Sequence, residues 1–185
     1  MATSFGPSAL ATPANGVTVA RLLAAPLLFV MIDGKDGSWA AFLLWFVLCV
    51  TDGIDGYLAR RHGTTRSGAF LDPLADKVLV LGAMFALVKQ GVFWWVPVAL
   101  IAVREIAISM YRSAAGRQGI TIPARSGAKV KTVCQQIAVG FALLPLTAGA
   151  RWLFNGFLWA AVFLTLFTGA QYLLDARRVA RAQLA

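Results

Sequence analysis

The sequence predicts an all-α integral membrane protein with six transmembrane helices and both termini in the cytoplasm. Its 185 residues are 59% hydrophobic and 14% charged, and the mean hydropathy is +0.72. Soluble domains are roughly 45–50% apolar and about 25% charged. Six long apolar runs follow one another along the chain, and basic residues gather at alternate connections between them. These features exclude a disordered chain and argue against an ordinary soluble domain.

Each apolar run has close to the ~20 residues that a helix needs to cross a bilayer. A helix satisfies its backbone hydrogen bonds internally, which lipid requires of a membrane-spanning segment. Turns rich in Gly, at 33–38 and 89–91, separate neighbouring runs. Because the connections are short, we expect one membrane domain over residues 1–185. The predicted spans are residues 17–32, 39–58, 69–88, 92–110, 130–148 and 152–174.

The distribution of Arg and Lys predicts the orientation. Eleven of them follow the second, fourth and sixth runs, whereas the opposite connections hold only Lys35, Lys89 and Arg151. The positive-inside rule then places both termini in the cytoplasm of a multi-pass protein of the cell membrane. The formal charge of +9 is expected to face anionic lipids or anionic substrates, and nucleic acid is not an expected partner.

Carboxylates inside the apolar runs predict the site. Five of the eight acidic residues lie in or at the ends of these runs, where an uncompensated charge costs several kcal/mol. Asp52 and Asp55 share one face of the second run. Asp72 and Asp76 lie one turn apart in the third, and Glu105 lies in the fourth. The four Asp side chains can converge on one pocket, where their oxygens suit a hard cation such as Mg²⁺ or Mn²⁺.

Other interpretations of these carboxylates remain open from the residues alone. The neighbouring Arg60, Arg61 and Arg66 could neutralise them without a metal ion. Asp72 could cap a helix that has Pro73 in its first turn. A small cation transporter could use the same carboxylates as its ion site, although such transporters are commonly built from repeats and no repeat is visible here.

The segment from Asp52 to Asp76 resembles the signature of the CDP-alcohol phosphatidyltransferase family. That signature reads D-x2-D-G-x2-A-R, a short gap, then G-x3-D-x3-D, and all eight specified residues are present. The family also has six transmembrane helices, so the resemblance extends over the rest of the chain. The matching residues are Asp52, Asp55, Gly56, Ala59, Arg60, Gly68, Asp72 and Asp76.

Three further stretches resemble the branch of this family that uses sn-glycerol 3-phosphate as its acceptor. Residues 15–26 look like its N-x-L-T-x-x-R-x4-P opening, with Val17 in place of the usual Leu. Residues 127–132 look like its G-K-x-K-T element, with Ala128 where that branch often has Lys. The stretch that begins Arg104-Glu-Ile also looks like this branch.

The resemblance implies a metal-dependent enzyme of phospholipid biosynthesis. An acceptor hydroxyl would attack the β-phosphorus of CDP-diacylglycerol and release CMP at a site facing the cytoplasm. It also implies a homodimer among membrane lipids. The four Asp residues would hold one or two Mg²⁺ or Mn²⁺ ions, with Asp76 also the general base. CDP-diacylglycerol would be bound by Asn15, Thr18, Gly56, Ala59, Arg60 and Gly68. The phosphate of the acceptor would be bound by Arg104, Arg112, Arg125, Lys129, Lys131 and Thr132.

Several alternatives remain at this level. Inositol phosphate, serine or phosphatidylglycerol could replace glycerol 3-phosphate as the acceptor without a change in chemistry. The cations between the fourth and fifth runs could serve topology and contact lipid headgroups. Arg104 is buried in a predicted span, so it either pairs with a carboxylate or points into the polar cavity.

Overall fold

The computed structural model describes the backbone of residues 13–62, 68–117 and 127–182, and side chains at 16–53, 74–111, 114, 130–172 and 174. Within these residues the chain forms six α-helices, one short 3-10 helix and no strand, so the predicted all-α fold is confirmed. The elements are α1 (Pro13–Met31), α2 (Trp39–His62), α3 (Gly68–Lys89), α4 (Trp95–Arg117), α5 (Gly127–Leu143), η1 (Pro145–Thr147) and α6 (Arg151–Ala182).

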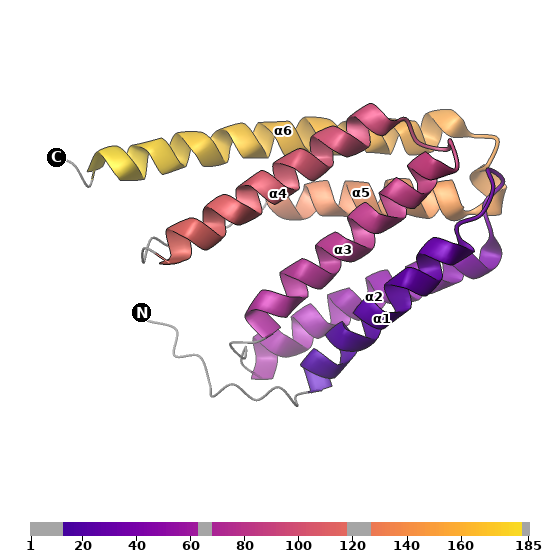
Figure 1. Cartoon of the computed structure of the whole chain (residues 1–185), viewed down its shortest axis with the longest axis horizontal. Coiled ribbons are helices and arrows are strands. Elements are labelled where there is room, and N and C mark those ends of the chain that lie inside the picture. The colour runs from indigo at the N-terminus through magenta and orange to yellow at the C-terminus, as the bar shows by residue number, and fades with distance from the viewer. Residues whose placement is uncertain (1–12, 63–67, 118–126, 183–185) are drawn as a thin grey trace.

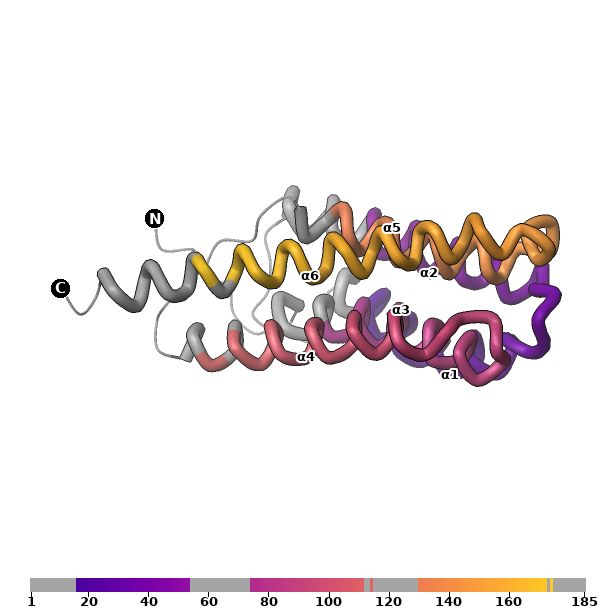
Figure 2. Tube along the Cα trace, turned by 90° about the horizontal axis from the view of Figure 1, so that it is seen from above, coloured from indigo at the N-terminus to yellow at the C-terminus, as the bar shows by residue number. Residues whose placement is uncertain are grey.

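The helices lie in two layers, which are visible when the bundle is seen from above (Figure 2). One layer holds α1, α3 and α4, and the other holds α2, α5 and α6. In the first layer α3 contacts both α1 and α4, and in the second α5 contacts both α2 and α6. Between the layers α1 contacts α2, α3 contacts α5, and α4 contacts α6. Side chains on the central helices α3 and α5 can therefore reach partners in both layers.

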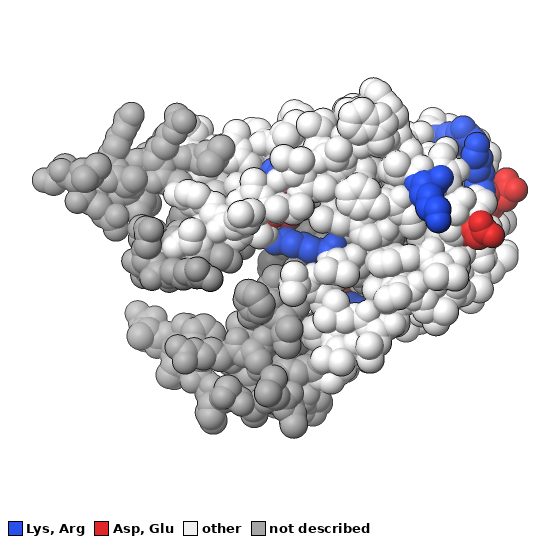
Figure 3. Space-filling model, in the orientation of Figure 1, with Lys and Arg blue, Asp and Glu red and all other residues white. Residues whose placement is uncertain are grey.

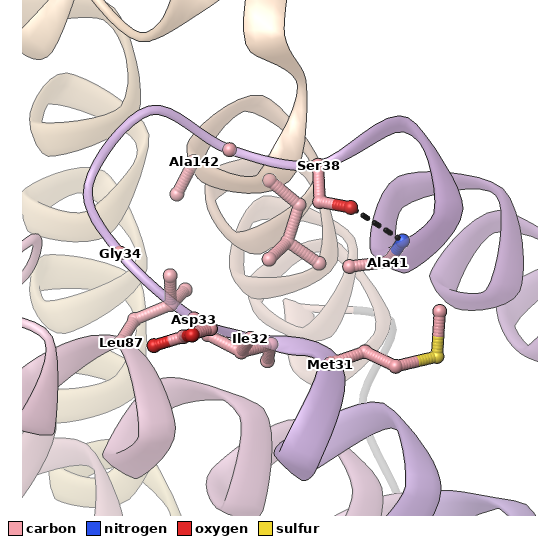
Figure 4. Close-up of a pocket in the computed structure, with 10 residues that line it drawn as sticks. Met31, Ile32, Asp33, Gly34, Ser38, Ala41, Leu87 and Ala142 are labelled. Atoms are coloured by element: carbon pink, nitrogen blue, oxygen red, sulfur yellow. Dashed lines mark hydrogen bonds between the residues drawn. The ribbon is translucent and has the colours of Figure 1, made fainter.

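The connections α1–α2, α3–α4 and α5–α6 lie together at one end of the bundle, and both chain ends lie at the other (Figure 1). We call these the connection end and the terminal end. Glycines form the turns at the connection end because the backbone there has positive φ, at Gly34 (+79°), Gly37 (+72°) and Gly91 (+69°). The Ser38 hydroxyl accepts a hydrogen bond of 3.4 Å from the Ala41 N–H at the start of α2 (Figure 4).

The helix bounds differ from the predicted spans where local chemistry outweighs hydropathy. The α5 helix ends at Leu143, short of residue 148, because Pro145 has no N–H to continue it and η1 begins there. The α4 helix begins at Trp95 because residues 90–94 form a turn, closed by the Val92 N–H on the Leu87 carbonyl. At the terminal end α4 and α6 continue beyond their apolar runs to Arg117 and Ala182.

The outer surface of the bundle is apolar. Large hydrophobic side chains are exposed on every helix, among them Leu23, Val30, Val103 and Phe163 at 68–77% exposure. Within the described residues one segment, Arg151–Tyr172, is long and apolar enough by itself to cross a membrane, with a mean hydropathy of 1.6. Three further apolar helical segments are shorter, namely Gly16–Met31, Trp39–Gly53 and Val130–Leu143.

A small pocket beside the α1–α2 turn has room for no more than about one water molecule. It is lined by residues such as Met31, Ile32, Leu87 and Ala142, and Asp33 lies at its edge (Figure 4). Because this pocket is too small for a substrate and its lining is mostly apolar, with Asp33 and Ser38 as its polar side chains, the candidate site lies elsewhere.

Candidate active site

The candidate site begins where the hydrophobic core of the bundle ends. In every helix the core residues lie toward the connection end, and buried polar residues follow on the terminal side. In α2, for example, the core runs from Ala41 to Leu48 and Asp52 follows, whereas in α3 Asp76 precedes a core that starts at Leu79. The change occurs at about the same depth in all six helices. It creates a polar zone between the two layers.

The acidic part of this zone joins α1, α2 and α3. The Arg21 Nη1 donates a hydrogen bond of 2.7 Å to Asp52 Oδ1, and Arg21 is only 2% exposed. Asp76 lies within electrostatic range of both Asp52 and Arg21. Two carboxylates from facing helices therefore share one buried guanidinium, which lowers the cost of holding them together.

The basic part joins α3, α4, α5 and α6. The Lys131 ammonium donates to Glu105 Oε1, and Arg104 Nη1 donates to the same oxygen at 3.2 Å. Arg104 Nη2 donates to the Thr168 hydroxyl at 3.0 Å. Figure 3 shows basic side chains in a hollow on this face, apart from the charged connection end.

Besides their packing contacts, α3 and α4 are joined by a hydrogen bond between Lys77 and Ser109. The Lys77 ammonium donates to Ser109 Oγ, and this hydroxyl donates to the Glu105 carbonyl at 2.6 Å. Lys131 lies within electrostatic range of Lys77, Arg104 and Asp76. The acidic and basic parts therefore meet between Asp76 and Lys131, on the two central helices.

The structure brings several of the predicted site residues together. Asp52, Asp76, Arg104 and Lys131 all lie in the polar zone, and Thr18 is buried one turn before Arg21 on α1. Thr132 follows Lys131 on α5 and is half-buried. The other predicted site residues lie outside the described side chains: Asn15, Asp55, Gly56, Ala59, Arg60, Gly68, Asp72, Arg112, Arg125 and Lys129.

The oxygen donors among the described side chains fit a hard divalent cation. Asp52 and Asp76 present carboxylate oxygens from facing helices, and oxygen is the donor that Mg²⁺ and Mn²⁺ prefer. No group of three or more metal-ligating side chains occurs within the described residues. Asp55 and Asp72, the other two predicted ligands, fall outside them.

Sequence reasoning missed part of the basic cluster. Lys77, Ser109 and Thr168 were not assigned a site role, and Glu105 was counted as an intramembrane acid without a partner. A signal was available for Lys77, because a Lys beside Asp76 in an apolar run is itself costly. No sequence signal pairs Glu105 with Lys131, because the two residues lie on different helices and 26 positions apart.

Residues 11–167 match the family described as CDP-alcohol phosphatidyltransferase. The chain belongs to the CDP-alcohol phosphatidyltransferase family. It is 39% identical over 180 residues to a probable phosphatidylglycerophosphate synthase of Mycobacterium tuberculosis, covering 94% of this chain and 85% of that protein. It is 37% identical over 170 residues to the CDP-diacylglycerol–glycerol-3-phosphate 3-phosphatidyltransferase of Escherichia coli, covering 87% and 92%.

Family membership confirms the resemblance found in the sequence, including the enzyme class. The similarity to both relatives spans most of each chain, so it is not confined to the eight-residue signature. It extends through α4, α5 and most of α6, where the basic cluster lies. The polar zone is therefore the candidate active site of a CDP-alcohol phosphatidyltransferase.

Proposed function

We propose that this enzyme transfers the phosphatidyl group of CDP-diacylglycerol to sn-glycerol 3-phosphate, forming phosphatidylglycerophosphate and CMP. The names of the similar enzymes support this pair of substrates. The observation that carries the proposal is the meeting of Asp76 with Lys131 in one buried zone. A carboxylate there can receive a proton while a neighbouring cation binds a phosphate.

In the proposed reaction the acceptor hydroxyl attacks the β-phosphorus of CDP-diacylglycerol. The new P–O bond forms as the bond to the leaving CMP breaks, and Asp76 takes the hydroxyl proton as general base. Arg21 holds Asp52 in place opposite Asp76. Proximity and orientation lower the barrier, because the donor and acceptor meet between two rigid helix layers.

A divalent cation, Mg²⁺ or Mn²⁺, belongs to this proposal. Asp52 and Asp76 would hold one or two ions together with Asp55 and Asp72. A bound ion would neutralise the pyrophosphate and stabilise the charge that develops on the leaving CMP. The protein's own part is to keep the two described carboxylates on facing helices, where Arg21 offsets their repulsion.

The basic cluster favours a phosphorylated acceptor. Lys131, Arg104 and Lys77 come from three helices, and two of them, Lys131 and Arg104, donate hydrogen bonds to Glu105. Arg and Lys side chains bind phosphate oxygens through charge-assisted hydrogen bonds. Serine and phosphatidylglycerol carry no phosphate monoester, so they would make less use of these cations.

We propose that all six helices cross the membrane, with the terminal end in the cytoplasm, and that the enzyme is a homodimer. The exposed apolar side chains on every helix support spanning. Charged residues reduce the hydropathy of α3 and α4, yet the described ones in the interior of these helices lie within the polar zone, namely Asp76, Lys77, Arg104 and Glu105. The excess of Arg and Lys at the terminal end supports the orientation.

The deciding experiment measures CMP release by the purified protein with CDP-diacylglycerol and Mg²⁺. Glycerol 3-phosphate, inositol phosphate, serine and phosphatidylglycerol are offered in parallel. We expect activity with glycerol 3-phosphate alone, and a raised KM for it in Lys131→Ala with the KM for CDP-diacylglycerol unchanged. Activity with another acceptor would retain the chemistry and reject the proposed substrate.

A further inference from the structure

Glu105 has no role in the reaction proposed above, yet it is the anion on which the basic cluster converges. Its Oε1 accepts from both Lys131 and Arg104. The three side chains are nearly enclosed, with exposures of 10% for Glu105, 6% for Lys131 and 13% for Arg104. Removing one partner of such a buried group leaves an uncompensated charge, which is costly.

Glu105 occupies an N–H donor of the Lys131 ammonium that a phosphate oxygen could otherwise use. A lysine ammonium binds carboxylate and phosphate oxygens with the same kind of charge-assisted hydrogen bond. A phosphate monoester entering this cluster therefore meets a binding position already held by a carboxylate. The Lys131 ammonium has three N–H donors, so both anions can contact it, but they share its single positive charge and each weakens the binding of the other.

We propose that Glu105 is an internal counter-anion that holds Lys131 in place between turnovers and yields it to the acceptor phosphate. This inference rests on the proposed function, because it takes Lys131 as a ligand of that phosphate. Glu105 is then a positioning residue and does not touch the reacting atoms.

The contacts of Arg104 allow Lys131 to turn from Glu105 to a phosphate while Glu105 keeps a cationic partner. After Lys131 turns to a phosphate, Glu105 keeps its hydrogen bond to Arg104 Nη1. Thr168 anchors the other end of the guanidinium through Nη2. The Arg104 Nε is buried and has no hydrogen-bond partner within the described residues, so it offers a spare donor. It faces Gly169, where a Cβ would come within 3.1 Å of this nitrogen.

Thermal unfolding of the purified protein tests the exchange with inorganic phosphate as the probe and no lipid substrate. Glu105→Gln keeps the shape of the side chain and removes its charge. We expect a lower Tm than the parent in phosphate-free buffer and a larger rise in Tm on adding phosphate. The rise should correspond to about fivefold or tighter apparent binding, since a competing anion has been removed.

Asp36→Asn is the matched control, because it makes the same change in charge at an exposed residue of the connection end. It should respond to phosphate as the parent does. In active enzyme, Glu105→Gln should lower the KM for glycerol 3-phosphate and leave the KM for CDP-diacylglycerol unchanged. If Glu105 had a purely structural role, the substitution would not change the KM for glycerol 3-phosphate while leaving the KM for CDP-diacylglycerol unchanged.

A phosphate response of Glu105→Gln equal to or below that of the parent would overturn the inference. If this variant aggregates without phosphate, recovery of folded protein by purification in phosphate supports the inference, and aggregation in both buffers rejects it. The double variant Glu105→Gln with Lys131→Met should regain stability and lose the response. If another acceptor proves correct while Glu105→Gln still binds phosphate more tightly, only the proposed substrate fails.

Discussion

Arg21 shows how one buried side chain supports the acidic part of the site. It is enclosed in α1 and donates to Asp52 of α2 at 2.7 Å, while Asp76 of α3 lies within electrostatic range. Arg21 therefore links three helices and reduces the repulsion between two carboxylates. Arg21 is the Arg of the N-x-L-T-x-x-R-x4-P pattern, but the sequence does not indicate whether it anchors α1 or reaches a ligand.

Replacing Arg21 should impair both folding and catalysis. Arg21→Gln leaves Asp52 without its charged donor, so we expect a loss of about 1.5–3 kcal/mol in the free energy of unfolding and a fall in CMP release. Arg21→Lys should keep part of both, because an ammonium restores the charge but not the fork of donors. Thermal unfolding and activity in detergent check this. An Arg21→Gln variant as stable and active as the parent would refute the role.

We expect replacement of Asp76 to reduce catalysis without reducing the stability of the fold. Asp76→Asn preserves the size of the side chain and removes its ability to accept the hydroxyl proton, so CMP release should fall by at least about 100-fold. The Tm should not fall, because two facing carboxylates become one. Asp33→Asn, an exposed residue at the connection end, is the control and should retain full activity. Substantial activity in Asp76→Asn would remove Asp76 from the catalytic role.

The residues of the acidic part could be predicted because the cost of a charge in an apolar run marks them one by one. Asp52 and Asp76 needed no knowledge of the packing. The basic part could not be predicted in the same way. The pairing of Glu105 with Lys131 depends on two long side chains that meet from α4 and α5, and helix periodicity carries no information about which helices come close.

At the scale of elements, hydropathy located the helices but not their ends. The apolar runs predicted six helices in the right places, and each end then followed local chemistry. Pro145 stops α5, and the turn at residues 90–94 delays α4. Small residues set the helix contacts. At Gly82 of α3 a Cβ would lie 2.2 Å from the ring of Phe29 on α1, so this glycine lets the two helices approach.

The α1–α2 turn offers a paired test of element geometry. Gly37 has φ +72°, and a Cβ there would lie 2.6 Å from the Leu143 carbonyl oxygen, which the Ser38 N–H also contacts at 2.9 Å. Gly34 has φ +79° with nothing within 4 Å of its Cβ position. Gly34→Ala should cost about 1–2 kcal/mol, from backbone strain alone.

Gly37→Ala should lower the Tm more than Gly34→Ala, because it adds a clash with the backbone at the end of α5 to the same strain. Both variants should remain catalytically competent when folded, since the turn lies at the end of the bundle away from the polar zone (Figure 1). Equal melting temperatures would show that the contact between this turn and α5 contributes nothing to stability.

For the whole molecule, the packing of two helix layers explains why one short signature can produce a site. The signature residues lie on α2 and α3, which belong to different layers. Arg21 joins them from α1, and α4, α5 and α6 contribute the basic cluster at a similar depth. The apolar core at the connection end holds the helices together. The core does not extend to the terminal end, and the excess of Arg and Lys in the sequence falls at that end.

This arrangement makes the membrane topology testable with two cysteine positions. In a background with Cys49→Ala and Cys134→Ala, Asp36→Cys places a thiol at the connection end and Gln118→Cys places one between α4 and α5. Because three proposed spans, α2, α3 and α4, separate these positions, they lie on opposite sides, and a membrane-impermeant maleimide should label Asp36→Cys in intact cells. Gln118→Cys should be labelled only after permeabilisation. The reverse pattern would place the terminal end outside the cytoplasm and reject the proposed orientation. Equal labelling of both positions would mean that α2, α3 and α4 do not all cross the membrane.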